Sequence, residues 1–203
     1  MKTQKIIALI AAAGHSRRMG FPKVLLPYDG DNIAISPLKF LWALRIKTFL
    51  TLPDFLLHNK QFCDYLSMFD ILIRANRYPN LGFSGSIKTV LAENKKTQGL
   101  LIFPIDAPFF SRSLLNAFIT TIDFNWPIIA VPHFYQAAGH PVYFSEHFFK
   151  ALIHADSIGG PHAVIRRNKK YVRRILWPDS RILWNLNYQK DINSSIKAQV
   201  YYL

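Results

Sequence analysis

Cysteine is almost absent from this sequence of 203 residues, in which Cys63 is the only one. A single cysteine excludes an internal disulfide framework, and no CxxC motif or paired Cys and His spacing suggests a structural zinc site. Long hydrophobic runs are also missing, because none approaches the roughly 18 to 20 residues that a membrane span requires. These absences predict a soluble protein without a membrane contact, and the reducing cytoplasm is its expected compartment.

Acidic residues are scarce, with 12 Asp and Glu against 25 Lys and Arg, and the formal net charge is +13. Half of the residues are hydrophobic, 14% are aromatic and only 18% are charged. This composition excludes a disordered chain, a collagen-like repeat and a long coiled coil. The sequence has no internal repeat and no linker-like change in composition, so we expect one domain over residues 1–203 with a sizeable core.

The positive charge is concentrated in residues 161–181, which we call the basic segment. It contains seven Lys or Arg residues and one Asp, so its local charge is +6. A solvated surface without a specific ligand is one interpretation of such a run. The segment lacks a helix-turn-helix spacing, a zinc-finger signature and an RNP-type aromatic motif, which argues against sequence-specific nucleic-acid binding. We expect it to attract an acidic protein partner or the phosphate of a small substrate.

Short apolar runs alternate with helical patterns along the chain, which predicts an α/β fold: a Rossmann-like, mostly parallel sheet with helices on both faces. The predicted strands lie at 5–12, 55–58, 71–75, 99–104, 128–132 and 142–144. Serine N-caps predict helices that start at Ser36, at Ser84 or Ser86, at Ser111 and at Ser145, and that end near residues 49, 93, 123 and 153. Ligands of such sheets bind at the carboxyl ends of the strands, so the loops there are the expected place of the chemistry.

The first predicted strand runs into a basic loop at residues 11–23, with the sequence AAAGHSRRMGFPK. Small residues and glycines let a backbone approach a ligand closely, and exposed amides can bind phosphate oxygens. Arg18 and Lys23 add positive charge. The loop fits neither GxxxxGK[ST] nor GxGxxG, the two common phosphate-binding motifs, so an ordinary basic turn stays open as an alternative on chemistry alone.

The string A-A-G-x-S-x-R-M-G-x-P-K in this loop resembles the signature of the MobA-like nucleotidyltransferases, a group that includes molybdenum cofactor cytidylyltransferase. The resemblance implies a glycosyltransferase-A-like Rossmann fold and nucleotidyl transfer from a nucleoside triphosphate. It also argues against a secretory signal at the N-terminus, since cleavage after the alanines would destroy the strand that leads into the loop. The residues that it implies for triphosphate binding are Ala12, Ala13, Gly14, Ser16 and Gly20, with Arg18 and Lys23 as the catalytic cations.

Further motifs, each after a predicted strand or near the end of the chain, extend the resemblance through most of the sequence. The segment NLGFSGSI at 80–87 resembles the loop that reads the nucleotide base, which implies base contacts for Asn80, Gly82 and Ser86. The segment IFPIDAP at 102–108 resembles the apolar strand that ends in a metal-binding D-x-P. GHPV at 139–142, and NLN at 185–187 followed by Asp191, resemble later elements near the second substrate and the metal.

Asp106 has the central role in this interpretation, on physical grounds as well as by resemblance. A carboxylate that follows a buried strand and is held by a proline turn can present one oxygen to Mg²⁺, which takes one or two protein oxygens and keeps its waters and phosphates. An ordinary turn before a helix is the structural alternative. The resemblance adds Asn187 as a second metal ligand and Asn185 as a substrate contact, while His140 is either a substrate contact or part of the scaffold of its turn.

The combined expectation is a Mg²⁺-dependent nucleotidyltransferase that transfers CMP from CTP to a phosphate-bearing acceptor and releases pyrophosphate. By resemblance, Ala13 favours CTP over GTP, and molybdopterin is the first expected acceptor, with a sugar phosphate or another alcohol phosphate as the alternative. The segment DSIGGPH at 156–162 departs from the G-D-x-G-A-R of molybdenum cofactor relatives. A nucleotide-binding relative without catalytic activity, with a basic surface for a partner, is the rival interpretation from another class.

Overall fold

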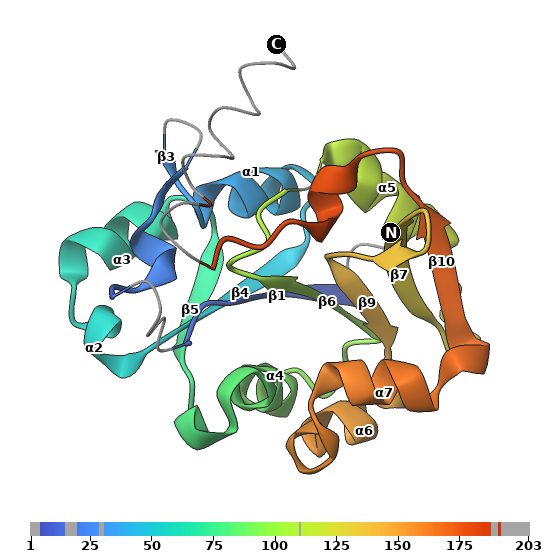
Figure 1. Cartoon of the computed structure of the whole chain (residues 1–203). Helices are drawn as coiled ribbons and strands as arrows, with labels where there is room; N and C mark the ends of the chain where they lie inside the picture. The colour runs from blue at the N-terminus through green and yellow to red at the C-terminus, as the bar shows by residue number, and fades with distance from the viewer. Residues whose placement is uncertain (1–4, 15–19, 29–30, 110, 188–190, 192–203) are drawn as a thin grey trace.

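The computed structural model describes residues 5–14, 20–28, 31–109, 111–187 and 191. Its centre is an eight-stranded sheet with the order β10-β7-β9-β6-β1-β4-β5, in which β8 pairs with β7 (Figure 1). β1 is parallel to β4 and β6, β4 is parallel to β5, and β7 is parallel to β10, whereas β9 is antiparallel to both of its neighbours. The strands are β1 Ile6–Ala11, β4 Lys47–Leu52, β5 Ile71–Ala75, β6 Gly99–Pro104, β7 Ile129–Phe134, β8 Ala137–Ala138, β9 Val142–Ser145 and β10 Val172–Leu176.

Helices cover both faces of the sheet, as Figure 1 shows, which confirms the predicted α/β class. Alternate residues of β1 belong to two different hydrophobic clusters, because successive side chains of a strand point to opposite faces. One face carries α1 Ile35–Ala43 and α5 Arg112–Thr121, and the other carries α4 Gly82–Glu93, α6 Phe149–Ile153 and α7 Pro161–Arg167. Smaller elements are β2 Pro27–Tyr28, β3 Asp31–Asn32, α2 Asp54–Leu57, α3 Lys60–Ser67 and the 3₁₀ turns η2 Lys23–Leu25, η3 Pro79–Leu81, η4 Glu146–Phe148, η5 Ala155–Ile158, η6 Lys169–Tyr171 and η7 Ser180–Leu183.

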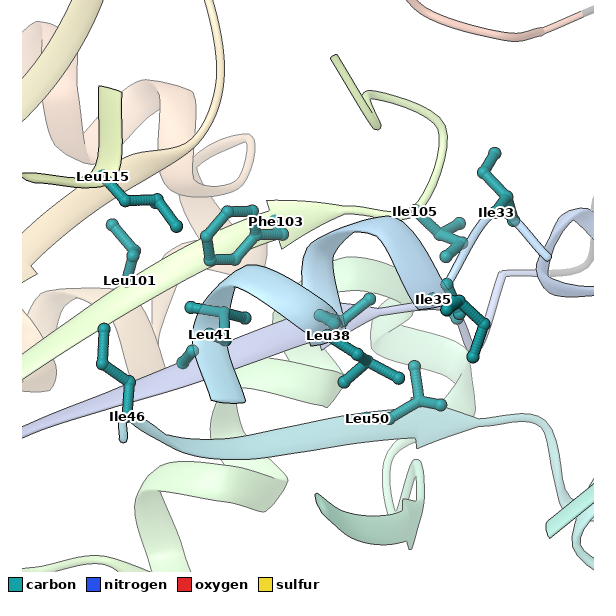
Figure 2. Packing of buried hydrophobic residues seen from close by; sticks show 14 of the residues in the cluster. Ile33, Ile35, Leu38, Leu41, Ile46, Leu50, Leu101, Phe103, Ile105 and Leu115 are labelled. Carbon is teal, nitrogen blue, oxygen red and sulfur yellow. The ribbon is translucent and has the colours of Figure 1, made fainter. Parts of the chain in front are cut away.

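The core between α1 and the sheet holds the strands that lead to the loops at their carboxyl ends. Figure 2 shows Leu38 and Leu41 on α1 close to Leu50 on β4 and Phe103 on β6. All four side chains are buried. Burial of such a side chain contributes roughly 1.5–3 kcal/mol, so this layer holds β1, β4 and β6 in a fixed register.

The second strand is not where the sequence predicted it. Residues 55–58 were expected to be a strand, but they fall on α2 and its C-cap. The strand in that part of the sheet is β4, and α1 ends at Ala43 rather than near residue 49. β4 is buried on both faces, so it has no polar alternation to mark it as a strand. The end of α1 also lacks the glycine that often marks the end of a helix. Arg45 adopts the left-handed conformation there instead, with a φ of 53°.

The predicted cap at Ser111 is confirmed, the helical stretch from Ser145 to Ile153 is present without a side-chain cap, and the starts predicted at Ser36 and at Ser84 or Ser86 are wrong. The Oγ of Ser111 accepts a hydrogen bond of 3.2 Å from the amide of Leu114 and caps α5. α1 begins at Ile35 and α4 at Gly82, so both helices start ahead of the serines that were expected to cap them. Ser145 precedes η4, but its hydroxyl accepts from the backbone amide just before β7 instead of capping the turn.

The basic segment contains a strand that the sequence analysis missed. It forms α7, η6 and then β10, which lies at the edge of the sheet beside β7. Arg181 at its end is paired with Asp179, at 2.6 Å between Nη2 and Oδ2, and this partner lowers the pKa of the Asp179 carboxyl. None of the helices in the described ranges is long and apolar enough to cross a membrane.

Candidate functional site

A cavity of about 180 Å³, which we call the site cavity, lies where β1 and β6 end. These strands are parallel neighbours, and Ala11 at the end of β1 is the register partner of Pro104 at the end of β6. The loops that follow them therefore meet at one edge of the sheet. The cavity is lined by Ala11, Ala12, Ala13, Gly14, Lys23, Gly82, Phe83, Ser86, Pro104, Ile105 and Asp106.

Lys23, Asp106 and Asn187 converge at this edge, although 164 residues separate the first from the last. The ammonium of Lys23 donates to Oδ2 of Asp106 at 2.8 Å and to Oδ1 of Asn187 at 3.0 Å. Lys23 comes from η2, and Asp106 lies two residues beyond the end of β6. Two oxygens from distant parts of the chain thus point at one cation, as in the predicted metal site.

The loop that carries Asn187 is attached directly to the Asp106 turn. The amide of Leu186 donates to the carbonyl oxygen of Asp106 at 2.7 Å. The amide of Asn187 donates to Oδ2 of Asp191 at 2.8 Å. Asp191 therefore holds the backbone of the loop in place. Asn185, which was predicted to contact substrate, is exposed, and its amide donates within its own loop to the carbonyl of Leu183 at 3.4 Å, so the structure does not bring it into the site.

The loop after β1 supplies small residues to the wall of the cavity, but its first amide is already in use. The backbone N–H of Ala12 donates to the carbonyl of Thr51 at 3.0 Å, so it does not face a ligand. Ala13 and Gly14 continue the wall. Gly20 has a φ of 76°, which favours glycine. The predicted site residues Ser16 and Arg18 lie outside the described residues.

The predicted base-reading loop approaches the same cavity from α4. Gly82 starts α4 with a φ of 52° and lines the cavity together with Ser86. Asn80 lies in η3 and lines a neighbouring groove together with Ser84 and Gly160. The structure therefore brings Gly82 and Ser86 to the site cavity and Asn80 to the groove beside it.

Two positioning residues of the site, Thr51 and Asn76, escaped the sequence analysis. Thr51 on β4 donates to the Oγ of the buried Ser86 at 2.9 Å and links the two loops. Asn76 closes the base-reading loop, because its Nδ2 donates to the carbonyl of Gly82 at 3.1 Å and its Oδ1 accepts from the amide of Tyr78 at 3.0 Å. Neither Thr51 nor Asn76 belongs to a recognisable motif, so only the packing of β4 and β5 against α4 shows their roles.

His140 lies in a second, larger cavity next to the site cavity. Its Nδ1 is buried and has no hydrogen-bond partner within the part of the chain that the structure describes. Burial lowers the pKa of His140 from 6.5 to about 4; nearby Asp106 opposes this change, and His162 adds to it. The imidazole is therefore neutral at physiological pH and is a weak base.

The donor set at the end of β6 fits a hard divalent cation. Carboxylate and amide oxygens suit Mg²⁺, which needs only one or two protein oxygens and keeps water and phosphate for its other positions. Lys23 already occupies the point between the Asp106 and Asn187 oxygens as a cation. Among the described residues, no group of three His, Cys, Asp or Glu side chains could hold a metal, so a metal site formed only by such protein ligands is not present there.

Comparison with known proteins decides the family. Residues 8–172 match the MobA-like NTP transferase domain. The chain belongs to the MobA-like NTP transferase family. A curated relative, the purine catabolism protein PucB of Bacillus subtilis (strain 168), is 27% identical over 156 residues, which are 73% of this chain and 75% of that protein.

Several solved structures share the fold at low sequence identity. Rv0371c from Mycobacterium tuberculosis H37Rv superimposes with a TM-score of 0.79 at 19% identity and covers 95% of this chain and 97% of its own. A structure of Rv0371c in complex with manganese also matches, with a TM-score of 0.69 at 17% identity over 95% of this chain and 98% of that one. Molybdopterin-guanine dinucleotide biosynthesis protein A from Archaeoglobus fulgidus has a TM-score of 0.70 at 15% identity over 97% and 99%. The predicted family and fold are thereby confirmed, and this MobA-like chain is a member of a nucleotidyltransferase family.

Proposed function

We propose that this MobA-like protein is a Mg²⁺-dependent cytidylyltransferase of the cytoplasm, which transfers CMP from CTP to a phosphate-bearing acceptor such as molybdopterin. The observation that carries the proposal is the convergence of Lys23, Asp106 and Asn187 beside the small-residue loop after β1. Family membership supports nucleotidyl transfer. The homologue with bound manganese supports a divalent cation. Ala13 supports CTP, because guanylyl-transferring relatives tend to have glycine at that position.

The chain's own residues bind and orient the two substrates. Asp106 and Asn187 would hold Mg²⁺, which neutralises charge on the triphosphate when it is bound. Lys23 and Arg18 bind phosphate oxygens, and Lys23 leaves its carboxylate partner for the phosphate. The loop around Gly14 and the α4 loop around Ser86 position the nucleotide next to this cluster. Positioning and charge neutralisation supply most of the rate of such a transfer.

No general base is needed for the reaction. An acceptor phosphate is already anionic near neutral pH, so its oxygen attacks the α-phosphorus without losing a proton to the protein. The new bond joins that oxygen to the α-phosphorus, and the bond from the α-phosphorus to its bridging oxygen breaks. Pyrophosphate leaves with the electron pair of that bond. His140, a weak base at its depressed pKa of about 4, contacts the acceptor instead of accepting a proton from it.

A sugar phosphate or another alcohol phosphate is the second candidate for the acceptor. The observation that favours it is the segment at 156–162, which lacks the G-D-x-G-A-R of molybdenum cofactor relatives. Pro161 and His162 of this segment line the larger cavity beside the site, so the altered sequence lies where the acceptor would bind. The part of the basic segment that faces away from this cavity would suit an acidic protein partner.

The proposal is tested by measuring pyrophosphate release with each nucleoside triphosphate, Mg²⁺ and a panel of phosphate-bearing acceptors. We expect CTP to be preferred, and Asp106→Ala to lower kcat roughly a hundredfold or more while the protein stays folded by circular dichroism. Asp64→Ala is the matched control, because Asp64 is exposed on α3. Wild-type rates in Asp106→Ala at saturating Mg²⁺ would remove Asp106 from the mechanism, and absence of turnover with every pair would favour the non-catalytic relative.

A further inference from the structure

A cavity of about 560 Å³, which we call the lateral cavity, lies next to the site cavity and shares Phe83 and Pro104 with it. It lies on the face of the sheet that α7 covers, and Figure 1 places α7 under β9 and β7. His133, His140 and His162 also line it. The two cavities are therefore adjacent, with Phe83 and Pro104 between them.

The floor of the lateral cavity is a row of residues that crosses four strands. Ile102 of β6 is the register partner of Val142 of β9, and Val131 of β7 is the register partner of Arg174 of β10. All four line the cavity. Strands in a sheet are about 4.8 Å apart, so three spacings place the β10 backbone about 14 Å from that of β6, the strand that leads to Asp106. An arginine side chain spans only part of this distance.

The six cations of the basic segment between α7 and β10 divide into two equal sets. Arg166, Lys169 and Arg174, which we call the inward set, line the lateral cavity. Arg167, Lys170 and Arg173, the outward set, do not line it. On β10 the reason is the strand geometry, since adjacent residues point to opposite faces of the sheet.

Of the inward set, Arg174 lies on β10, the strand of the cavity floor that is farthest from β6, Lys169 lies in η6, which leads into β10, and Arg166 lies on α7. No acidic side chain is among the described residues that line this cavity. Among the described residues, the guanidinium of Arg174 donates only to the Oε1 of Gln136, at 3.4 Å, which is a long contact for a guanidinium. Cations that line one cavity without an acidic partner there repel one another, and an anionic ligand group would relieve this repulsion and form charge-assisted hydrogen bonds.

The remainder of the lateral cavity is suited to the body of a ligand. Its floor and wall carry apolar side chains from β6, β7, β9 and α7. The Nδ1 of His133 donates to the carbonyl of Val131 at 3.0 Å, since a carbonyl has no proton to give, and this fixes the orientation of the ring. The Nδ1 of His140 is buried and lacks a partner within the described ranges. Such an apolar surface with a few polar nitrogens is typical of a small-molecule site.

We propose that the acceptor of this enzyme carries a second anionic group, a phosphate or a carboxylate, which the inward set binds at the far end of the lateral cavity. The inference rests on the proposed nucleotidyl transfer and favours the second candidate acceptor, a sugar phosphate or other alcohol phosphate that carries a further anionic group, over molybdopterin, which has a single phosphate and no carboxylate. The phosphate that attacks has to lie near Lys23 and Asp106, so the remote cations serve a different group of the same molecule. Arg166, Lys169 and Arg174 are accordingly residues that determine acceptor specificity.

The test uses simple probes and isothermal titration calorimetry without nucleotide at fixed ionic strength. Hexane-1,6-diol bisphosphate, 6-phosphooxyhexanoate and hexyl phosphate share one chain length and differ in the second anion. We expect the wild-type protein to bind at least one of the two probes with a second anion roughly tenfold more tightly than hexyl phosphate. Which of the two binds more tightly distinguishes a phosphate from a carboxylate.

Two triple variants that lose the same amount of positive charge distinguish specific binding of the second anion from general electrostatic attraction of the probe. Arg166→Gln, Lys169→Gln and Arg174→Gln together should abolish the preference for the second anion. The matched control combines Arg167→Gln, Lys170→Gln and Arg173→Gln and should keep it. Equal losses in both triple variants, or no preference in the wild type, would overturn the proposal. If thermal unfolding shows that the inward triple variant is not folded, the single variants Arg174→Gln and Arg173→Gln are compared in the same titrations.

The outcome is distinguishable from failure of the proposed function itself. CTP binding with Mg²⁺ and pyrophosphate release are measured separately in the wild-type protein. If the protein neither binds CTP nor releases pyrophosphate, the proposed nucleotidyl transfer is wrong. The probe titrations then still show whether the lateral cavity binds a second anion.

Discussion

Acidification should destabilise this protein through His140 by an amount that the structure allows us to work out. The imidazole is largely buried, and its Nδ1 has no partner among the described residues. Removal from water disfavours the charged form, so burial lowers the pKa of His140 from 6.5 to about 4 even though Asp106 pulls it upward. The perturbation is a change of pH from 7 to 4, compared between the wild type and His140→Gln.

The sign follows from proton uptake. Below pH 6.5 the unfolded chain protonates this histidine, while the folded protein does not do so until about pH 4. The contribution of His140 to the free energy of unfolding is therefore fully present above pH 6.5 and is lost as the pH falls towards 4. A difference from 6.5 to about 4 corresponds to about 3 kcal/mol at 1.36 kcal/mol for each pH unit.

The assay is urea unfolding at pH 7, 6, 5 and 4, in the presence of EDTA so that no metal changes the charge near Asp106. The free energy of unfolding of the wild type should fall by about 3 kcal/mol more than that of His140→Gln over this range. Other titrating groups affect both proteins and cancel in the comparison. His154→Gln is the control for loss of a histidine, because His154 is exposed. An identical pH dependence in the wild type and His140→Gln would refute the reasoning.

Further outcomes follow from the triphosphate cations and the core. Lys23→Ala and Arg18→Ala should each weaken CTP and GTP to a similar degree, because these cations pair with phosphate and not with the base; in calorimetric titrations, an altered CTP to GTP preference with unchanged triphosphate affinity would contradict that role. Leu38→Ala should lower the free energy of unfolding in urea by about 2–5 kcal/mol, since Leu38 is fully buried between α1 and the sheet. A loss below about 1 kcal/mol would mean that α1 is not packed as the structure describes.

The acceptor side of the site depends on residues that lie close together in the sequence but on different surfaces. The basic segment was expected to bind either an acidic protein or a substrate phosphate. Each residue of the inward set is next to a residue of the outward set in the sequence. The same short segment can therefore bind a substrate anion on one side and an acidic protein on the other. Only the inward set has access to a ligand in the lateral cavity.

The sequence alone predicted the first strand, the signature of the loop after it and the strand before Asp106. These elements are local: β1 and β6 are short apolar runs that are buried between two layers of helices, and each run ends at small or turn-forming residues. The loop signature is likewise a matter of spacing within a dozen residues. The order of these patterns also predicted the α/β class, because apolar runs that alternate with helical patterns can bury both faces of a parallel sheet.

Other features of the fold could not be read from local patterns. β4 was missed because a strand that is buried on both faces has the same apolar composition as the end of a helix, and Arg45 gave no sign that α1 stops there. The edge strand β10 was missed because its two arginines interrupt the apolar run that would indicate a strand. Its pairing with β7 is visible only in the structure.

Which of the predicted residues lie together in one site became visible only in the packed fold. Lys23, Asp106 and Asn187 meet through hydrogen bonds that span 83 and 164 residues, and Thr51 is joined to Ser86 across the two loops. The same packing left Asn185 outside the site. Contacts of this kind depend on the order of strands in the sheet, which is set by the burial of the whole chain and by no single motif.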